Sequence, residues 1–139
     1  MLGLNEIFKE LKGLLSPHFK TVRMTALPVN EQLTNELMAI NPDNLPAVLV
    51  VYKRGEFTHQ NAVRDNIVSL VIIDRYRAGD DERALGAFEV LEKAIGVFIP
   101  YGRQTDSGTV YLPLDCGTVS VDPSYACFEL SLAVKQPAV

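Results

Sequence analysis

Hydrophobic residues recur at helical spacing in three segments of the chain. The first segment precedes Pro17 and has charged residues between its apolar positions, which are Leu4, Ile7, Phe8, Leu11, Leu14 and Leu15. The second follows Asn30, a residue that can cap a helix, and stops before Pro42 because proline disfavours the helical conformation in the residue that precedes it. The third covers residues 82–98. This spacing predicts three amphipathic helices.

The third helical segment carries its large apolar residues along one stripe, which consists of Leu85, Phe88, Leu91, Ile95 and Phe98. Asp80 or Asp81 is placed to cap its start, where a carboxylate also suits the helix dipole. Glu89 and Lys93 form a favourable pair four residues apart on the other side. We therefore expect one long helix that ends before Pro100.

Strand-length apolar runs occupy the middle and the C-terminal third of the chain. Residues 47–52 and 67–73 are apolar almost throughout, which is typical of strands covered on both faces, and a polar stretch joins them as an antiparallel pair. Residues 126–134 alternate, which predicts a strand with one face on a core and the other wet or at an interface. Shorter strands are predicted at residues 19–25, 110–114 and 119–121.

The order of these elements predicts the fold class. Helices and strands follow one another as αβαββαβββ, which favours an α+β domain: a mainly antiparallel β-sheet with about three helices packed on it. No repeat, low-complexity segment or linker divides the sequence. We therefore expect a single domain over residues 1–139.

The composition and charge of the chain argue against several classes of function. The 139 residues are 47% hydrophobic and 22% charged, with a formal net charge of −4, which is typical of a globular domain. An acidic chain is a poor candidate for specific nucleic-acid binding or for anionic membranes, since both require clustered Lys and Arg. No apolar run reaches the length of a membrane helix, and the first segment is too charged for a secretory signal. We expect the protein to stay in the cytosol where it is made.

Catalytic and metal-binding patterns are scarce in the sequence. It contains no phosphate loop, dinucleotide-binding glycine motif, zinc-protease motif or nucleophile elbow. His18 and His59 would both be needed for a metal site, together with carboxylates from distant segments. A Ser/His/Asp set can be assembled from Asp106, Ser107 and His59, but the same residues followed by glycine are typical of a polar turn. The expectation is no catalytic residue, no metal and no cofactor.

The two cysteines fit a reducing compartment. Cys116 and Cys127 are expected to be free thiols and to behave as small buried hydrophobic residues. Because they fall in neighbouring predicted strands, a disulfide or a reactive thiol is the alternative.

The most informative polar segment is a loop of both charge signs. It places Arg75, Tyr76 and Arg77 beside Asp80 and Asp81. Arg and Tyr are enriched in protein interfaces, and a loop of mixed charge suits contact between copies, where the cations of one meet the anions of the next. The hypothesis is that these five residues form part of a subunit interface, and the alternative is a solvated loop.

The order of several segments resembles that of a known family. Residues 45–52, with the sequence LPAVLVVY, resemble the corresponding strand of a family of Mu-like phage tail proteins. A strand that ends in a charged and aromatic turn follows at residues 67–77, then a helix at residues 83–99 and a long alternating strand at residues 126–134. The leucine-rich helix at residues 4–15 matches the start of that family. The resemblance covers most of the chain.

That family is similar to the tail-terminator proteins of long-tailed phages. The resemblance implies a structural subunit, without catalytic residues, that forms a homo-hexameric ring. Such a ring caps the tail tube and joins it to the head, so its partners are tail tube and sheath proteins and head-completion proteins. It is made in the bacterial host cytoplasm and ends in the virion tail.

Two alternatives stay open at this point. One is another neck or baseplate adaptor of a phage-derived contractile machine. The other is a small α+β hydrolase that uses the polar loop at residues 101–108 with His59.

Overall fold

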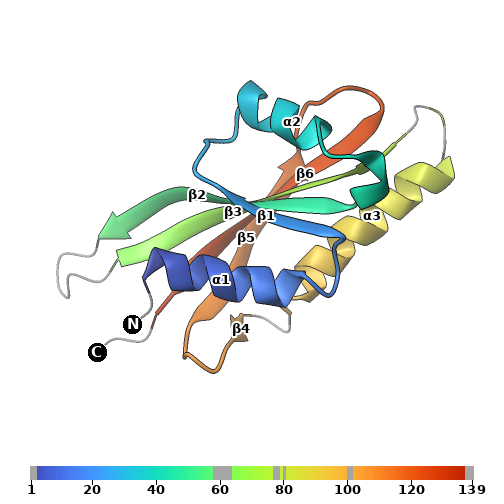
Figure 1. Cartoon of the computed structure of the whole chain (residues 1–139). Coiled ribbons are helices and arrows are strands. Elements are labelled where there is room, and N and C mark those ends of the chain that lie inside the picture. The colour runs from blue at the N-terminus through green and yellow to red at the C-terminus, as the bar shows by residue number, and fades with distance from the viewer. Residues whose placement is uncertain (1–2, 58–63, 77–78, 80, 100–101, 137–139) are drawn as a thin grey trace.

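The structure is a computed structural model, and it describes residues 3–57, 64–76, 79, 81–99 and 102–136. Its elements are shown in Figure 1 and follow in chain order as α1 (Leu4–Leu15), β1 (Thr21–Thr25), α2 (Glu31–Met38), the short 3₁₀ helix η1 (Pro42–Asn44), β2 (Ala47–Phe57), β3 (Arg64–Arg75), α3 (Asp81–Gly96), β4 (Arg103–Gln104), β5 (Val110–Thr118) and β6 (Tyr125–Lys135).

The six strands form one sheet in the order β1-β2-β3-β6-β5-β4. The neighbouring pairs are antiparallel except β1 and β2, which run parallel with Thr21 opposite Ala47. A parallel pair needs a crossover, and here α2 and η1 supply it. The expected α+β fold, a mainly antiparallel sheet with three helices packed on it, is confirmed, and β1 is the parallel exception.

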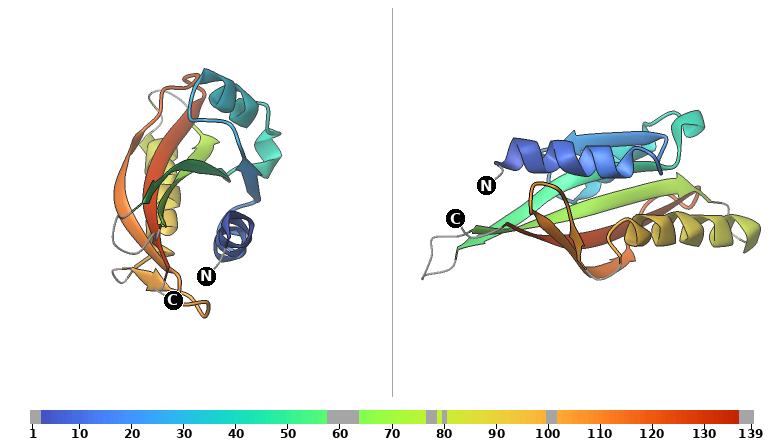
Figure 2. Two further views of the ribbon diagram at one scale, coloured as in Figure 1. Left: turned by 90° about the vertical axis from the view of Figure 1, so that its left-hand side faces the viewer. Right: turned by 90° about the horizontal axis from the view of Figure 1, so that it is seen from below.

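The helices cover opposite faces of the sheet. Figure 2 shows α1 and α3 on one face, whereas Figure 1 shows α2 on the other. Side chains alternate along β2, so Val48 and Val50 enter the core under α1 and α3, while Leu49 enters the core under α2. The prediction that residues 47–52 are covered on both faces is therefore confirmed.

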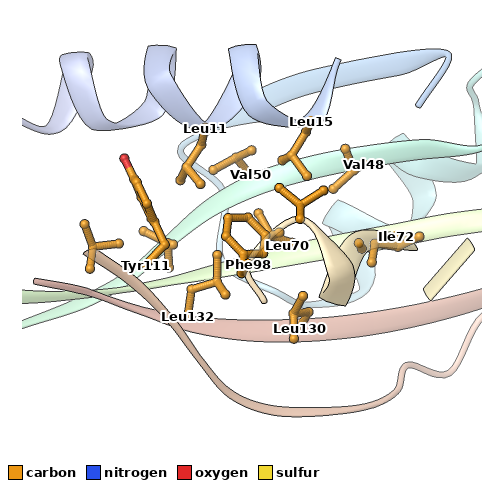
Figure 3. Packing of buried hydrophobic residues seen from close by; sticks show 14 of the residues in the cluster. Leu11, Leu15, Val48, Val50, Leu70, Ile72, Phe98, Tyr111, Leu130 and Leu132 are labelled. Atoms are coloured by element: carbon orange, nitrogen blue, oxygen red, sulfur yellow. The ribbon is translucent and has the colours of Figure 1, made fainter. Parts of the chain in front are cut away.

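The larger core lies beneath α1 and α3. In Figure 3, Leu11 and Leu15 of α1 point towards the sheet, and Phe98 from the turn after α3 lies among the strand side chains. Tyr111 of β5 packs against Phe98 with ring centroids 6.0 Å apart. Both aromatic side chains are fully buried. Burial of such large side chains makes this core the main source of stability.

The smaller core lies beneath α2. Asn30 caps this helix by accepting a hydrogen bond from the backbone N–H of Leu33 at 3.2 Å, as its position in the sequence predicted. Leu33 and Leu37 then pack on the sheet residues Leu49, Val71, Ile73 and Cys127. This face of β6 was expected to be wet or at an interface. It is instead largely buried, because α2 and the strand connections cover it.

Away from α2, the same sheet face carries polar side chains. Ser69 of β3 lies opposite Ser131 of β6, and both side chains are buried. Lys53 of β2 and Glu129 of β6 approach to 4.0 Å, so this ion pair spans the intervening β3. Within the described part of the chain, the two serine hydroxyl oxygens have no hydrogen-bond partner.

The strands of the C-terminal third differ from the prediction. Strand β5 continues to Thr118 along β6, whereas residues 119–121 lie in the connection between the two strands. Val119 still donates its backbone N–H to the Cys127 carbonyl at 2.9 Å. Strand β4 lies within the expected polar loop. Ladder hydrogen bonds explain both differences, because they extend a strand without regard to the polarity of its side chains.

Candidate interaction surface

The long helix α3 is buried along only half of its length. The spacing of its apolar residues predicted one continuous stripe, and the C-terminal half follows it with Ala94 and Phe98 in the larger core. In the N-terminal half, Leu85 is 63% exposed and Phe88 is 53% exposed. Ala87 supplies the contact with the sheet there. Two large apolar side chains of the predicted stripe therefore lie at the protein surface.

Phe88 borders an apolar groove of about 330 Å³. The groove runs between the N-terminal half of α3 and the hairpin of β5 and β6. Its lining is mostly apolar and includes Phe88, Val119, Val121, Tyr125 and Phe128. The rings of Phe88 and Phe128 are 5.9 Å apart, so half of an aromatic pair is open to solvent. We call this region, with the residues around it, the groove end.

The loop hypothesised as a subunit contact meets this groove. Tyr76 lines it, and its backbone N–H donates to the Ser124 carbonyl at 2.9 Å, which holds the loop against the β5–β6 connection. Arg75 forms an ion pair with Asp43 at 3.3 Å. Asp81 is exposed as the first residue of α3.

The remaining two residues of that hypothesis, Arg77 and Asp80, lie outside the described residues. The structure therefore brings Arg75, Tyr76 and Asp81 to one end of the molecule, beside an apolar surface that the sequence analysis did not identify. An interface prediction based on charge alone missed the apolar part of this surface.

Carboxylates surround the groove end. Asp43, Asp81, Glu82 and Asp122 are all exposed there. The pKa of Asp122 is lowered because the backbone N–H and the hydroxyl of Ser124 hydrogen-bond to its carboxylate, which keeps it charged. Arg75 and Arg83 are the nearby basic residues. An apolar groove with a charged rim is the usual anatomy of a protein interface.

A second polar cluster joins α1 to the turn between β4 and β5. Glu10 accepts hydrogen bonds from the hydroxyls of Thr105 at 2.7 Å and Tyr111 at 2.8 Å, and from Ser107 at 3.1 Å. Gly108, with a φ of 84°, allows the tight turn that brings these hydroxyls together. Burial, and then the carboxylate of Glu10, raise the pKa of Tyr111, because both favour the neutral phenol.

Two of the three residues of the hydrolase alternative, Asp106 and Ser107, lie in the described chain. Ser107 donates to Glu10, and its hydroxyl oxygen lies 3.0 Å from that of Thr109, within hydrogen-bond distance, while Asp106 is exposed in the turn. His59 lies outside the described residues, and His18 is exposed after α1. Ser107 therefore contacts a carboxylate and a hydroxyl, and its hydrogen bond to Glu10 holds the turn between β4 and β5 against α1.

Both cysteines are free thiols, as expected. Cys127 is buried at the groove, and burial together with the charge of Glu129 raises its pKa to about 12. Cys116 is exposed on β5, so the expectation that both are buried is wrong for this residue. Strand β5 leaves it exposed because its second edge has no neighbouring strand in the described chain beyond the short β4.

Among the described residues, no group of three or more His, Cys, Asp or Glu side chains could hold a metal ion. No helix in the same part of the chain is long and apolar enough to cross a membrane. No protein-family model matches the sequence, and no curated protein matches it.

Proposed function

We propose that the chain is a structural assembly subunit of a contractile phage or prophage tail, of the tail-terminator type. Six copies would form a ring that caps the tail tube and joins it to the head. The ring would assemble in the bacterial host cytoplasm and remain in the virion tail. Its partners would be other copies of the chain, the tail tube and sheath proteins, and head-completion proteins.

The observation that carries the assembly role is the apolar groove end. A half-exposed aromatic pair, the exposed Leu85 and a charged rim have the features of a protein-binding surface. The sequence resemblance supports the assignment to a phage tail, and the similarity of that family to tail-terminator proteins suggests the terminator role. A neck or baseplate adaptor is the alternative.

A ring requires one surface of each subunit to meet a different surface of its neighbour. We therefore expect the groove end to supply one of two contact surfaces. The double charge reversal Arg75→Glu and Arg77→Glu tests this, because it replaces the two cations of the charged loop with anions, in a segment whose described residue Arg75 already lies beside carboxylates. Exposed ion pairs such as Arg75 with Asp43 contribute at most about 1 kcal/mol, so the subunit should still fold.

The measurement is the solution mass by light scattering after size exclusion. We expect the wild-type protein to form the oligomer and the double variant to lose it. Lys9→Glu with Lys12→Glu is the matched control, since it makes the same charge change at exposed positions of α1, a helix that does not line the groove. An unchanged mass in the Arg75 and Arg77 variant would remove this loop from the interface.

A further inference from the structure

The second contact surface can be sought at the opposite end of the molecule. Strands β2 and β3 extend beyond the rest of the sheet as a two-stranded ribbon: residues 54–57 pair with β3, and β1 reaches only as far as Val51. The pairing of β3 with β6 begins at Asn66. In Figure 1 this ribbon projects on the left, whereas α3 begins on the right. We call residues 54–57 and 64–66 the hairpin end.

An aromatic side chain at this end is largely exposed, and no element of the described chain covers it. Phe57 is 72% exposed, more than the other exposed large hydrophobic residues of the described chain. It is the final residue of β2, where one strand alone pairs with it. Isolated exposed apolar residues are common, but a fully presented phenyl ring on a projecting ribbon has the form of an interface anchor.

The groove end offers a matching receptor. Its lining brings Phe88, Tyr125 and Phe128 around a depression that is already apolar, and aromatic rings pack favourably on one another in offset or tilted arrangements. A phenyl ring inserted there would cover the exposed side of the pair formed by Phe88 and Phe128, and would also cover the lining residues Val119 and Val121.

The charges of the two ends are complementary. At the hairpin end and beside it, the exposed cations Lys53, Arg54 and Lys135 outnumber the exposed anion Glu56, although Glu56 is slightly more exposed than its partner Arg54. At the groove end the reverse holds, since Asp43 is more exposed than its partner Arg75, and Asp122 is fully exposed. The surface around the hairpin end therefore presents more exposed cations than anions, and the groove end presents more anions. This difference favours contact between unlike ends.

We propose that the occupant of the groove is a second copy of this chain, which inserts Phe57 from its hairpin end. The proposal rests on the proposed ring function and names both surfaces of its repeating contact. Because donor and receptor lie at opposite ends, each copy can give one contact and receive another. Such heterologous contacts continue from copy to copy until a ring closes.

A photo-crosslinking experiment tests the contact directly. The donor chain carries benzoylphenylalanine in place of Phe57, which keeps an aromatic group there, and Phe88→Glu, which blocks its own groove. The acceptor is the wild-type chain with an affinity tag. After irradiation at high protein concentration, the cross-linked peptides are identified by mass spectrometry. We expect cross-links between position 57 of the donor and residues 118–128 of the acceptor.

Two acceptor variants sharpen this result. Phe88→Glu places a charge at the apolar groove. We expect it to reduce the cross-link yield about tenfold or more, which corresponds to a modest loss of binding free energy. Leu114→Glu is the matched control, because Leu114 is as exposed as Phe88 but does not line the groove, and its yield should match the wild type. Circular dichroism confirms that each variant is folded.

The alternative receptor is a second apolar groove between α1 and β1, lined by Leu4, Phe8, Met24 and Tyr52. Cross-links to those segments, or no intermolecular cross-link, would overturn the proposal. A hexameric wild type without the expected cross-link would leave the ring in place and remove this contact. A monomeric wild type that gives the cross-link would support the contact and remove the ring.

Discussion

The two halves of α3 make a direct comparison, because each ends in one aromatic pair. Directly after the C-terminal half, Phe98 packs on Tyr111 at 6.0 Å, and both rings are completely buried. In the N-terminal half, Phe88 packs on Phe128 at 5.9 Å, but Phe88 remains half exposed. One pair lies under α1 and the other has no covering element in the described chain. The first pair therefore serves folding, and the second is available for assembly.

The two aromatic pairs consist of similar residue types, and they differ in exposure because α1 covers only one of them. Helix α1 lies over the part of the sheet that Phe98 reaches, and Leu11 and Leu15 close that space, as Figure 3 shows. Beyond the end of α1, the N-terminal half of α3 lies beside the end of β3 and the β5–β6 hairpin, and the groove remains between the helix and that hairpin. A second copy of the chain would act at the groove as α1 acts over the core.

The largest expected effect is on folding. Phe98→Ala removes a completely buried ring, and we expect it to lower the free energy of unfolding by roughly 3–5 kcal/mol. Phe88→Ala removes a half-exposed ring, and the expected loss is only about 0.5–1.5 kcal/mol, the usual worth of an aromatic pair. Urea denaturation of the two variants at a protein concentration that keeps the chain monomeric measures both. Equal losses would contradict the division of α3 into a folding half and an assembly half.

A smaller effect concerns alkaline pH. The pKa of Tyr111 is raised in the folded protein, so above about pH 10 the unfolded chain loses a proton that the folded chain retains. The contribution of Tyr111 to the free energy of unfolding is therefore fully present below about pH 10. Above pH 10 it falls by about 1.4 kcal/mol per pH unit. Tyr111→Phe should flatten the decline.

The matched control for this prediction comes from the other aromatic cluster. Tyr125→Phe removes a phenol that lines the groove, and its profile between pH 9 and pH 11 should follow the wild type. Cys127 contributes to the same decline, because its pKa is raised to about 12 in the folded protein, so all three proteins keep this residue unchanged. A Tyr111→Phe profile as steep as that of the wild type would show that burial at this site does not control the phenol.

The sequence predicts most of the core elements because their patterns are strong. Residues 47–52, 67–73 and 126–134 lie within β2, β3 and β6, and the three helices form where apolar spacing places them. Continuous apolar runs also predict correctly that β2 has a core on each face. These features follow from local periodicity, which the tertiary structure preserves.

Other features depend on partners that local patterns do not specify. The parallel pairing of β1 with β2 is set by the crossover through α2, and nothing in residues 19–25 encodes its direction. The polar residues 54–57 continue β2 because β3 runs beside them. Leu85 and Phe98 belong to the same stripe of α3, yet only Phe98 meets a covering helix.

The candidate surface shows the same division. The charged loop was identifiable from its composition, and three of its five residues reach the groove end in the described chain. The groove itself joins α3 to the β5–β6 hairpin, segments whose proximity no sequence pattern indicates. The exposed Phe57 carried no signal either, because an aromatic residue at a strand end is equally typical of a core. The one indication of this surface in the sequence was the large number of apolar residues along α3.

The most direct test of the account is the mass of the wild-type protein in solution, measured by light scattering after size exclusion at two concentrations. Six copies of the 15.4 kDa chain give about 92 kDa. The account predicts this mass at both concentrations, with rings visible by negative-stain electron microscopy. A mass of 15.4 kDa at both concentrations would contradict it.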